Sequence, residues 1–167
     1  MNRAVYQSEF YIVEETKKQE VIVHDLIPDS TSVVVIHKGC VLLVTQYREA
    51  VGEQTFELPG GTIKPGEDKI IAVQRELEEE AGVLCGDIKY VGSAYPMASL
   101  VNRQVHFYFT DDVRKVTDLQ QDEDEDVIPV WVPLRNAYRK MINGTSNDSM
   151  MGHALLLCAL HGLLKLD

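Results

Sequence analysis

The chain has 167 residues and carries 26 Asp and Glu against 16 Lys and Arg, a formal net charge of −10. This length suits one domain, and the acidic excess argues against nucleic-acid backbones and anionic membranes as partners, because both recruit Lys and Arg. The excess is local. Residues 67–80 and 111–126 carry net charges of −4 and −6, which together equal that of the whole chain. These two acidic clusters need an explanation.

The three cysteines show no paired spacing, so the sequence suggests neither a disulfide framework nor a zinc site. The start of the chain lacks the apolar core of a signal peptide. The longest apolar stretch, 154–160, is far shorter than the ~20 residues that span a bilayer. We therefore expect a soluble, reduced protein of the cytoplasm.

The first half of the chain reads mainly as strands. β-Branched or aromatic runs predict strands at Phe10–Val13, Val21–His24, Ser32–His37 and Val41–Gln46. Lys38-Gly39 between the last two indicates a tight hairpin turn. Residues 33–36 do not alternate in polarity, so their strand is expected to be covered on both faces.

A turn-rich segment, 52–66, precedes the first predicted helix. Asp68 stands one position before the helical pattern, and Gly82 is its expected stop. The apolar stripe at helical spacing is Ile70, Val73, Leu77 and Ala81. An amphipathic helix over 69–81 follows from this pattern.

Three further strands are predicted at Ile88–Ala94, Val105–Phe109 and Val127–Val132. Pro133 opens a short helix to about residue 143, and Asn147 or Asp148 caps a last helix to Leu166. Strands with helices between and after them predict one α/β or α+β sandwich.

The first acidic cluster has a spacing that points to chemistry. Glu76, Glu79 and Glu80 stand at i, i+3 and i+4, so a helix places their carboxylates on one face. Like charges this close repel, which favours a cation that neutralises them, and oxygen ligands select Mg²⁺, Mn²⁺ or Ca²⁺. Arg75 and Glu67 are available to orient them. The alternative is a solvated acidic helix face, the usual meaning of a Glu run.

At these residues the chain resembles a known family. Gly61, Glu67 and Arg75-Glu76-Leu77-Glu78-Glu79-Glu80-Ala81-Gly82-Val83 fill every fixed position of a Nudix box over 61–83. The resemblance implies an α/β/α sandwich with a mixed sheet. It also implies divalent-metal-dependent hydrolysis of a nucleoside diphosphate linked to another moiety.

Segments outside the box are similar to the ADP-ribose and nucleotide-sugar pyrophosphatase branch. They are Gln46-Tyr47-Arg48, Glu57-Leu58-Pro59-Gly60-Gly61 and 122–134, with an N-terminal antiparallel strand segment, 1–30, ahead of a catalytic core, 31–167. One segment departs from it: 95–104 lacks the Ser-Pro-Gly turn and following Glu usual in ADP-ribose hydrolases. The departure favours nucleotide sugars broadly over ADP-ribose alone.

The resemblance also assigns roles. The implied metal ligands are Glu76, Glu79, Glu80, Glu125 and the Gly60 carbonyl. The implied catalytic residues are Glu76, Glu79 and Arg75, with Glu123 as general base. The implied substrate-binding residues are Arg48, Glu57 and Glu67.

Each role has a simpler alternative. Glu67 is equally a charge at a helix N-terminus, Glu123 and Glu125 equally belong to a solvated loop, and Arg48 could be a surface arginine. Phe10 or Tyr11 could stack on a nucleobase, although core packing is the more common use of either.

The resemblance therefore implies a Mg²⁺-dependent enzyme, with Mn²⁺ as a substitute, that cleaves nucleoside diphosphate sugars, with ADP-ribose as one candidate, to a nucleoside monophosphate and a sugar phosphate. The alternatives are a house-cleaning hydrolase of nucleoside triphosphates and a non-catalytic domain that senses nucleotides. The expected partner is this small molecule, with no nucleic acid or membrane, and the resemblance implies a homodimer.

Overall fold

The computed structural model describes residues 2–117, 127–146 and 148–165. Its elements are β1 (Arg3–Gln7), β2 (Tyr11–Glu15), β3 (Val21–Asp25), β4 (Asp29–His37), β5 (Cys40–Arg48), β6 (Glu53–Glu57), α1 (Lys69–Ala81), β7 (Val83–Cys85), β8 (Lys89–Ala94), β9 (Gln104–Thr110), β10 (Val113–Val116), β11 (Ile128–Pro133), α2 (Leu134–Ile142) and α3 (Ser149–Leu160). Within these ranges, no helix combines the length and apolarity that a membrane span requires.

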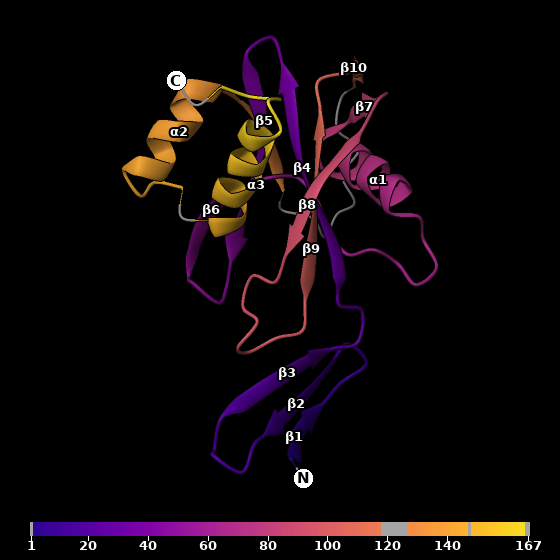
Figure 1. Ribbon diagram of the computed structural model, residues 1–167, viewed down its shortest axis with the longest axis vertical. Coiled ribbons are helices and arrows are strands. Elements are labelled where there is room, and N and C mark those ends of the chain that lie inside the picture. Colours follow the sequence, from indigo (N-terminus) through magenta and orange to yellow (C-terminus); the bar gives the residue numbers. More distant parts are fainter. Residues whose placement is uncertain (1, 118–126, 147, 166–167) are drawn as a thin grey trace.

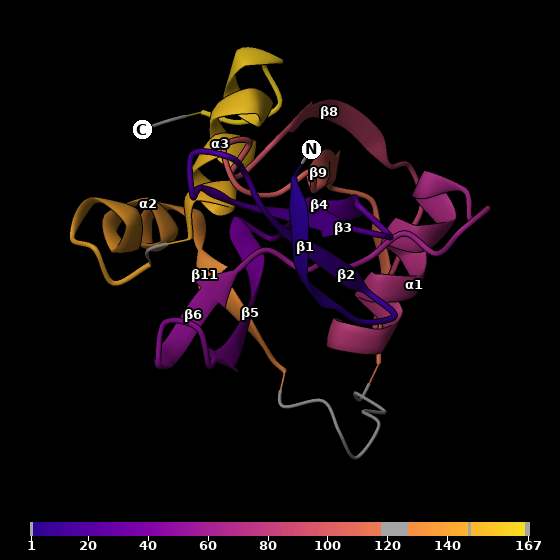
Figure 2. The ribbon, with the colours of Figure 1, turned by 90° about the horizontal axis from the view of Figure 1, so that it is seen from below.

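A six-stranded mixed sheet forms the centre of the molecule. Its order is β11-β5-β4-β9-β8, with β6 paired to β5, and β4 and β9 are its parallel pair. Helix α1 covers one face, and α2 and α3 cover the other (Figures 1 and 2). The α/β/α sandwich with a mixed sheet is thus confirmed.

Strand β4 contributes to the core on both faces of this sheet. Val33 and Val35 pack with α1, whereas Val34 packs with α3, and all three are fully buried. The non-alternating run correctly predicted a strand covered on both sides. Lys38 and Gly39 both have positive φ (50° and 76°), as the predicted two-residue turn requires.

The sheet divides between β4 and β5, and this division makes room for the site. The two strands pair only next to their turn, at Ile36 with Val41 and His37 with Cys40. Beyond that point β5 pairs with β6, while β4 accepts the segment 59–63 as its neighbour. Glycine-rich backbone therefore enters the centre of the fold.

Helix α1 begins and ends where the sequence indicates. The Asp68 carboxylate accepts hydrogen bonds from the backbone N–H groups of Ile70 and Ile71, and Gly82 adopts the left-handed conformation (φ 62°) at the other end. Within the predicted apolar stripe, Val73, Leu77 and Ala81 are buried, whereas Ile70 is 44% exposed.

The chain before Asp29 forms a separate three-stranded antiparallel sheet, β1-β2-β3, at the lower end of the molecule (Figure 1). This N-terminal sheet confirms the expected strand segment. It joins the core through the β8–β9 loop: the Val23 N–H donates to the Leu100 carbonyl (2.7 Å). Every residue of β1 is exposed.

Several boundaries differ from the sequence prediction. Strands β1, β6, β7 and β10 were not predicted. Each has only three to five residues, and most of their side chains are exposed, so their sequences lack the run of buried apolar residues that indicates a strand. The last helix ends at Leu160, not at Leu166, because the chain turns after His161 and Gly162 has φ of 70°. Its cap is Asp148.

Candidate active site

Two glycines bring the 59–63 segment against β4 and α1. A Cβ on Gly60, whose φ is +149°, would stand 2.2 Å from the Thr31 carbonyl oxygen. A Cβ on Gly61 would stand 2.5 Å from Oε1 of Glu76. Both positions therefore require glycine: one for the approach to the strand, the other for the approach to the helix.

The carboxylates of α1 face this glycine segment. Glu80 is buried (8% exposed), and its Oε2 accepts a hydrogen bond from the Gly60 N–H (2.9 Å). The Glu76 side chain is 12% exposed and lies against Gly61. A solvated helix face would expose both side chains, so the solvated alternative is wrong for these two. Glu79, 46% exposed, lies nearer solvent.

Arg75 holds three of the box carboxylates together. Its Nη1 donates to Oε1 of Glu76 (2.8 Å) and to Oε2 of Glu79 (2.9 Å). Its Nε and Nη2 donate to the two carboxylate oxygens of Glu67 (2.9 and 3.1 Å), and Nη2 also reaches the Thr62 carbonyl (3.0 Å). The guanidinium thus orients the acidic cluster from within the same segment.

These contacts set the charge of the cluster. Hydrogen bonds from Arg75, and then from the Lys64 N–H, lower the pKa of Glu67 to about 2. The same carboxylates raise the pKa of Arg75 above its ordinary value, Glu67 most strongly. Glu67 is therefore a carboxylate at any physiological pH, and in this structure it orients Arg75.

The donor set suits a hard divalent cation. The carboxylates of Glu76 and Glu80 lie against the backbone of Gly61 and Gly60, and Glu79 lines the same cleft. Over the described residues, no three His, Cys, Asp or Glu side chains already converge as a ligand set. Glu76 and Glu79 are held by Arg75, and Glu80 by Gly60.

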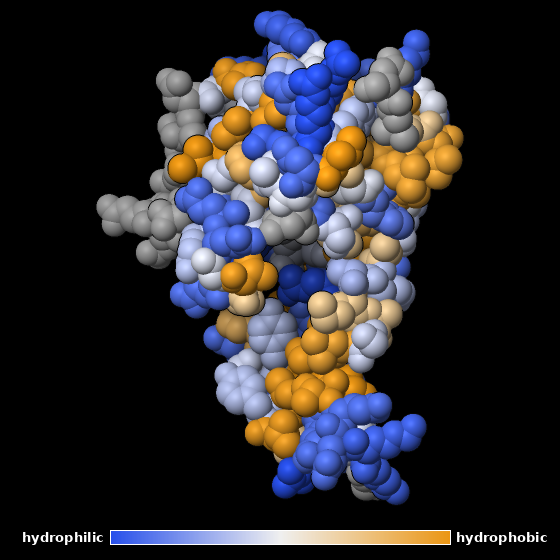
Figure 3. Space-filling view, turned by 90° about the vertical axis from the view of Figure 1, so that its left-hand side faces the viewer, coloured by the Kyte–Doolittle hydropathy of each residue, from blue (hydrophilic) through white to orange (hydrophobic). Residues whose placement is uncertain are grey.

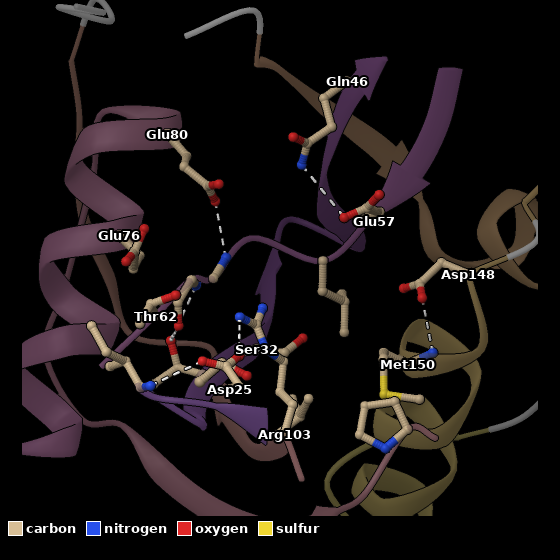
Figure 4. Close-up of a pocket in the computed structure, with 18 of the residues that line it drawn as sticks. Asp25, Ser32, Gln46, Glu57, Thr62, Glu76, Glu80, Arg103, Asp148 and Met150 are labelled. Atoms are coloured by element: carbon tan, nitrogen blue, oxygen red, sulfur yellow. Dashed lines mark hydrogen bonds and ion pairs between the residues drawn. The ribbon is translucent and has the colours of Figure 1, made fainter. Parts of the chain in front are cut away.

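A cleft of about 780 Å³ lies beside these groups. Figure 4 shows Glu76 and Glu80 on one side of it and Gln46, Glu57 and Asp148 on the other. Figure 3 shows this face of the molecule hollowed above the N-terminal sheet. We call Gly60, Gly61, Thr62, Arg75, Glu76, Glu79 and Glu80 the box wall. We call Phe10, Tyr11, Asp25, Arg48, Glu57, Arg103 and Asp148 the assembled wall.

Arg48 lies in the assembled wall beside Glu57. Its Nε and Nη2 donate to the two Glu57 oxygens (2.8 and 2.5 Å), the paired geometry typical of guanidinium and carboxylate. Burial acts to raise the Glu57 pKa, but hydrogen bonds from Arg48 and Thr55 outweigh it, and that pKa is lowered. Of the three residues predicted to bind substrate, Arg48 and Glu57 thus line the cleft as an ion pair, whereas Glu67 is paired with Arg75 and is not among the residues that line it.

Asp148 belongs to the same end of the cleft. Its carboxylate caps α3 by accepting from the N–H groups of Met150 (3.0 Å) and Met151 (2.9 Å). Burial raises its pKa, and the negative charge of Glu57 adds to this effect. The sequence predicted the helix cap but gave no indication that this side chain would line a cleft.

Other residues of the assembled wall were missed or misread. Phe10 and Tyr11 line the cleft and are 51% and 37% exposed, so the core-packing interpretation is wrong for both. Asp25 and Arg103 form an ion pair that the sequence did not indicate. The sequence marked only one of the two, and only by a difference: Arg103 stands in the segment 95–104, which departs from the ADP-ribose hydrolase pattern. Glu123 and Glu125 lie outside the described residues.

Several known proteins resemble this chain in sequence or in fold. A family model described as "NUDIX domain" matches residues 27–151. The chain is 29% identical over 130 residues to the methanol dehydrogenase activator of Bacillus methanolicus, covering 75% of this chain and 69% of that protein. It is 24% identical over 143 residues to the ADP-ribose pyrophosphatase of Bacillus subtilis (strain 168), covering 84% and 76%.

Among solved structures, one titled "Crystal structure of ADP compounds hydrolase" superposes with a TM-score of 0.77 and 19% identity, covering 98% of this chain and 95% of that one. This likeness concerns the fold.

Proposed function

The chain belongs to the NUDIX domain family and is a Nudix hydrolase, and from that premise we propose that it hydrolyses nucleoside diphosphate sugars, ADP-ribose among them, with Mg²⁺. The products are a nucleoside monophosphate and a sugar phosphate. One observation carries the proposal: the box carboxylates line a cleft that is also lined by two exposed aromatic rings and by an arginine–glutamate pair. The Bacillus subtilis relative, an ADP-ribose pyrophosphatase, supports the substrate class.

The charge of the cleft supports the metal. Counted over the described residues, six carboxylates line it, against four cationic side chains: Arg48, Lys64, Arg75 and Arg103. A diphosphate is itself anionic and would be repelled by such a cleft without a cation. Glu76, Glu79 and Glu80 would hold Mg²⁺ with the Gly60 carbonyl. When bound, it neutralises phosphate charge and makes a coordinated water more acidic.

The protein's own residues do the remaining work. Arg75 keeps the carboxylates of Glu76 and Glu79 oriented, and Glu67 fixes Arg75 in turn. Arg48 binds a phosphate of the substrate. We propose Glu123 as the base that takes the proton of the attacking water, and Glu125 as a further metal contact. As the water oxygen bonds to phosphorus, the anhydride bond breaks and the second phosphate leaves.

The nucleobase end is proposed to be the aromatic pair. The rings of Phe10 and Tyr11 lie 6.5 Å apart at 59°, both at the cleft. Stacking on an exposed ring tolerates any base and contributes about 1–3 kcal/mol per base. The sugar beyond the diphosphate then extends toward Glu57 and Asp148, whose carboxylates can accept hydrogen bonds from its hydroxyl groups.

We also propose a homodimer that uses the N-terminal sheet. This sheet exposes Val5, Tyr6 and Val21 (49, 59 and 47%), and apolar side chains gather in the lower part of the molecule (Figure 3). Exposed apolar groups clustered on one small sheet are typical of an interaction surface. Light scattering coupled to gel filtration measures the mass, and a monomer at all concentrations would contradict this proposal.

A substrate panel tests the activity. Intact nucleotide sugars resist alkaline phosphatase, whereas both proposed products release phosphate to it, so a coupled assay with Mg²⁺ or Mn²⁺ reports cleavage. We expect turnover of one or more nucleotide sugars and formation of a nucleoside monophosphate. Pyrophosphate released from a nucleoside triphosphate, with no turnover of any nucleotide sugar, would replace this substrate assignment by the triphosphate alternative.

A further inference from the structure

A second arginine, Arg103, enters the cleft from the segment that precedes β9. It lines the cleft next to Asp25 and Ser32 (Figure 4). Its side chain is 35% exposed, whereas that of Asp25, its partner in the ion pair, is 3% exposed. A buried carboxylate thus holds a guanidinium at the surface of the cleft.

The position of this guanidinium is fixed from several directions. Nε and Nη2 of Arg103 both donate to Oδ2 of Asp25 (2.7 and 2.5 Å). The other Asp25 oxygen, Oδ1, accepts from the Ile27 N–H (2.9 Å). The adjacent Asn102 binds the Asp25 backbone on both sides: its Oδ1 accepts from the Asp25 N–H (2.7 Å), and its Nδ2 donates to the Asp25 carbonyl (3.1 Å). The arginine is therefore pre-organised.

One end of the guanidinium remains for a ligand. The hydrogen bonds among the described residues engage Nε and Nη2, and Nη2 also reaches the Tyr11 hydroxyl (3.4 Å). The two N–H groups on Nη1 have no such acceptor within the described ranges. A planar guanidinium with one edge held by a carboxylate can still grip an anion with the other.

The neighbours of Arg103 identify that anion. On one side lies Tyr11, part of the aromatic pair, and on the other lie Ser32 and Thr62 beside the glycine segment of the box wall. A nucleoside stacked on the aromatic pair would direct its 5′-phosphate past Arg103 toward the box carboxylates. Arg48 stands at the other end of the cleft, with Glu57 and Asp148.

We propose that Arg103 binds the phosphate attached to the nucleoside and that Asp25 is its positioning residue, an inference that rests on the proposed function for the aromatic pair. The two arginines then divide the diphosphate: Arg103 takes the nucleoside phosphate and Arg48 takes the sugar phosphate. Each is oriented by a carboxylate, Asp25 or Glu57.

The ion pair also ties the N-terminal sheet to the core, so the test must separate binding from architecture. Calorimetric titration with Mg²⁺ present measures the affinity for a nucleoside and for its 5′-monophosphate, which is not hydrolysed. For Arg103→Gln we expect a loss of about 10- to 100-fold for the monophosphate, the range for a charge-assisted hydrogen bond, and less than about twofold for the nucleoside.

Two conservative variants complete the series. Arg103→Lys keeps the charge but loses the paired N–H donors of the guanidinium, so its affinity for the monophosphate should lie between those of the wild type and Arg103→Gln. Asp25→Asn keeps the shape but frees the arginine, so it should also weaken the monophosphate and not the nucleoside. Arg114→Lys is the matched control, because Arg114 forms a similar ion pair with Asp112 away from the cleft and is 67% exposed.

Equal losses for nucleoside and monophosphate in folded variants would make the pair purely architectural and overturn the assignment. Unchanged affinity for the monophosphate, or no binding of any monophosphate by the wild type, would overturn it too. A chain that discriminates the monophosphate through Arg103 but cleaves no nucleotide sugar would refute the proposed substrate and leave Arg103 as a nucleotide phosphate ligand.

Discussion

The two walls of the cleft are built in different ways. The box wall comes from one continuous stretch, 60–80, in which helix α1 carries all three carboxylates and the glycine segment supplies backbone. The assembled wall draws on the N-terminal sheet, β5, β6, the β8–β9 loop and the start of α3. Arg75 is paired with groups no more than 13 positions away, whereas Arg103 is paired with Asp25 across 78 positions.

This difference suggests a division of labour. Chemistry that needs carboxylates at fixed spacing can be carried by a single helix, because the helix itself sets the spacing. Recognition of a particular substrate needs groups at both ends of a cleft, which no single element can span. We therefore expect variants of the box wall to lower kcat, and variants of the assembled wall to raise KM.

Glu76→Gln should break the box wall most severely. The variant keeps the shape of the side chain but removes the charge that would hold the metal, so we expect kcat to fall about 10³-fold, in line with several kcal/mol of lost transition-state stabilisation. The coupled phosphatase assay measures it. Glu78→Gln is the control, because Glu78 is exposed on the same helix and does not line the cleft. Full activity in a folded Glu76→Gln would refute the metal-site assignment.

Gly60→Ala should separate the effect of the close contact with β4 from the effect of a positive φ alone. Its Cβ would meet the Thr31 carbonyl at 2.2 Å in addition to the positive φ, so we expect a loss of about 4 kcal/mol in the free energy of unfolding. Gly66→Ala has positive φ (80°) but open space, so it should cost about 1–2 kcal/mol. Urea unfolding measures both, and equal losses would show that close approach to β4 is unimportant.

Phe10→Ala should sharpen the assignment of the assembled wall. If this ring stacks on the base, KM should rise about 10-fold, within the range for one stacked base, while kcat changes little. Tyr47→Ala is the control: Tyr47 is similarly exposed (56%) but does not line the cleft. Steady-state kinetics on the best nucleotide sugar decide the matter, and a fall in kcat at unchanged KM would argue against a base platform.

Glu67→Gln should produce the smallest effect, and its dependence on pH is diagnostic. The folded-state pKa of Glu67 is lowered to about 2, below the ordinary value of 4.5. Its contribution to stability is therefore present above about pH 4.5 and is lost as the pH falls toward 2. Urea unfolding without metal should show wild type more stable than the variant at pH 7, with the difference vanishing near pH 2. A difference that is constant with pH would mean that the Arg75 pairing is not responsible.

Much of the core was predictable from residue patterns. The buried run at 33–36, the Lys38-Gly39 turn and the ends of α1 all follow from local rules, and the structure confirms them. The strands that were missed are held by their partners: β7 pairs with β10, and β6 completes a hairpin with β5. Their own sequences are too short or too polar to indicate a strand.

The candidate site divides in the same way. The helical spacing of Glu76, Glu79 and Glu80 placed them on one face, and the resemblance to the Nudix box, which also includes Arg75, gave the four residues their predicted roles. Glu80 nonetheless proved buried against Gly60, which a charge run does not suggest. The exposure of Phe10 and Tyr11 was not predicted, because an aromatic side chain in a strand-forming run does not indicate whether another element will cover it.

By itself, the sequence determined the box: the helix that carries the carboxylates, the arginine that orients them and the glycines that admit the backbone. The pairs between Arg75 and the box carboxylates lie within 13 positions of each other along the chain, so local geometry sets them, whereas the contact of Gly60 with β4 depends on the packing of the sheet. Only the tertiary structure decided what stands opposite. The N-terminal sheet places Asp25 beside Arg103, and α3 places Asp148 beside Arg48 and Glu57. Contacts between distant segments depend on how the sheets and helices pack, and no local pattern encodes that packing.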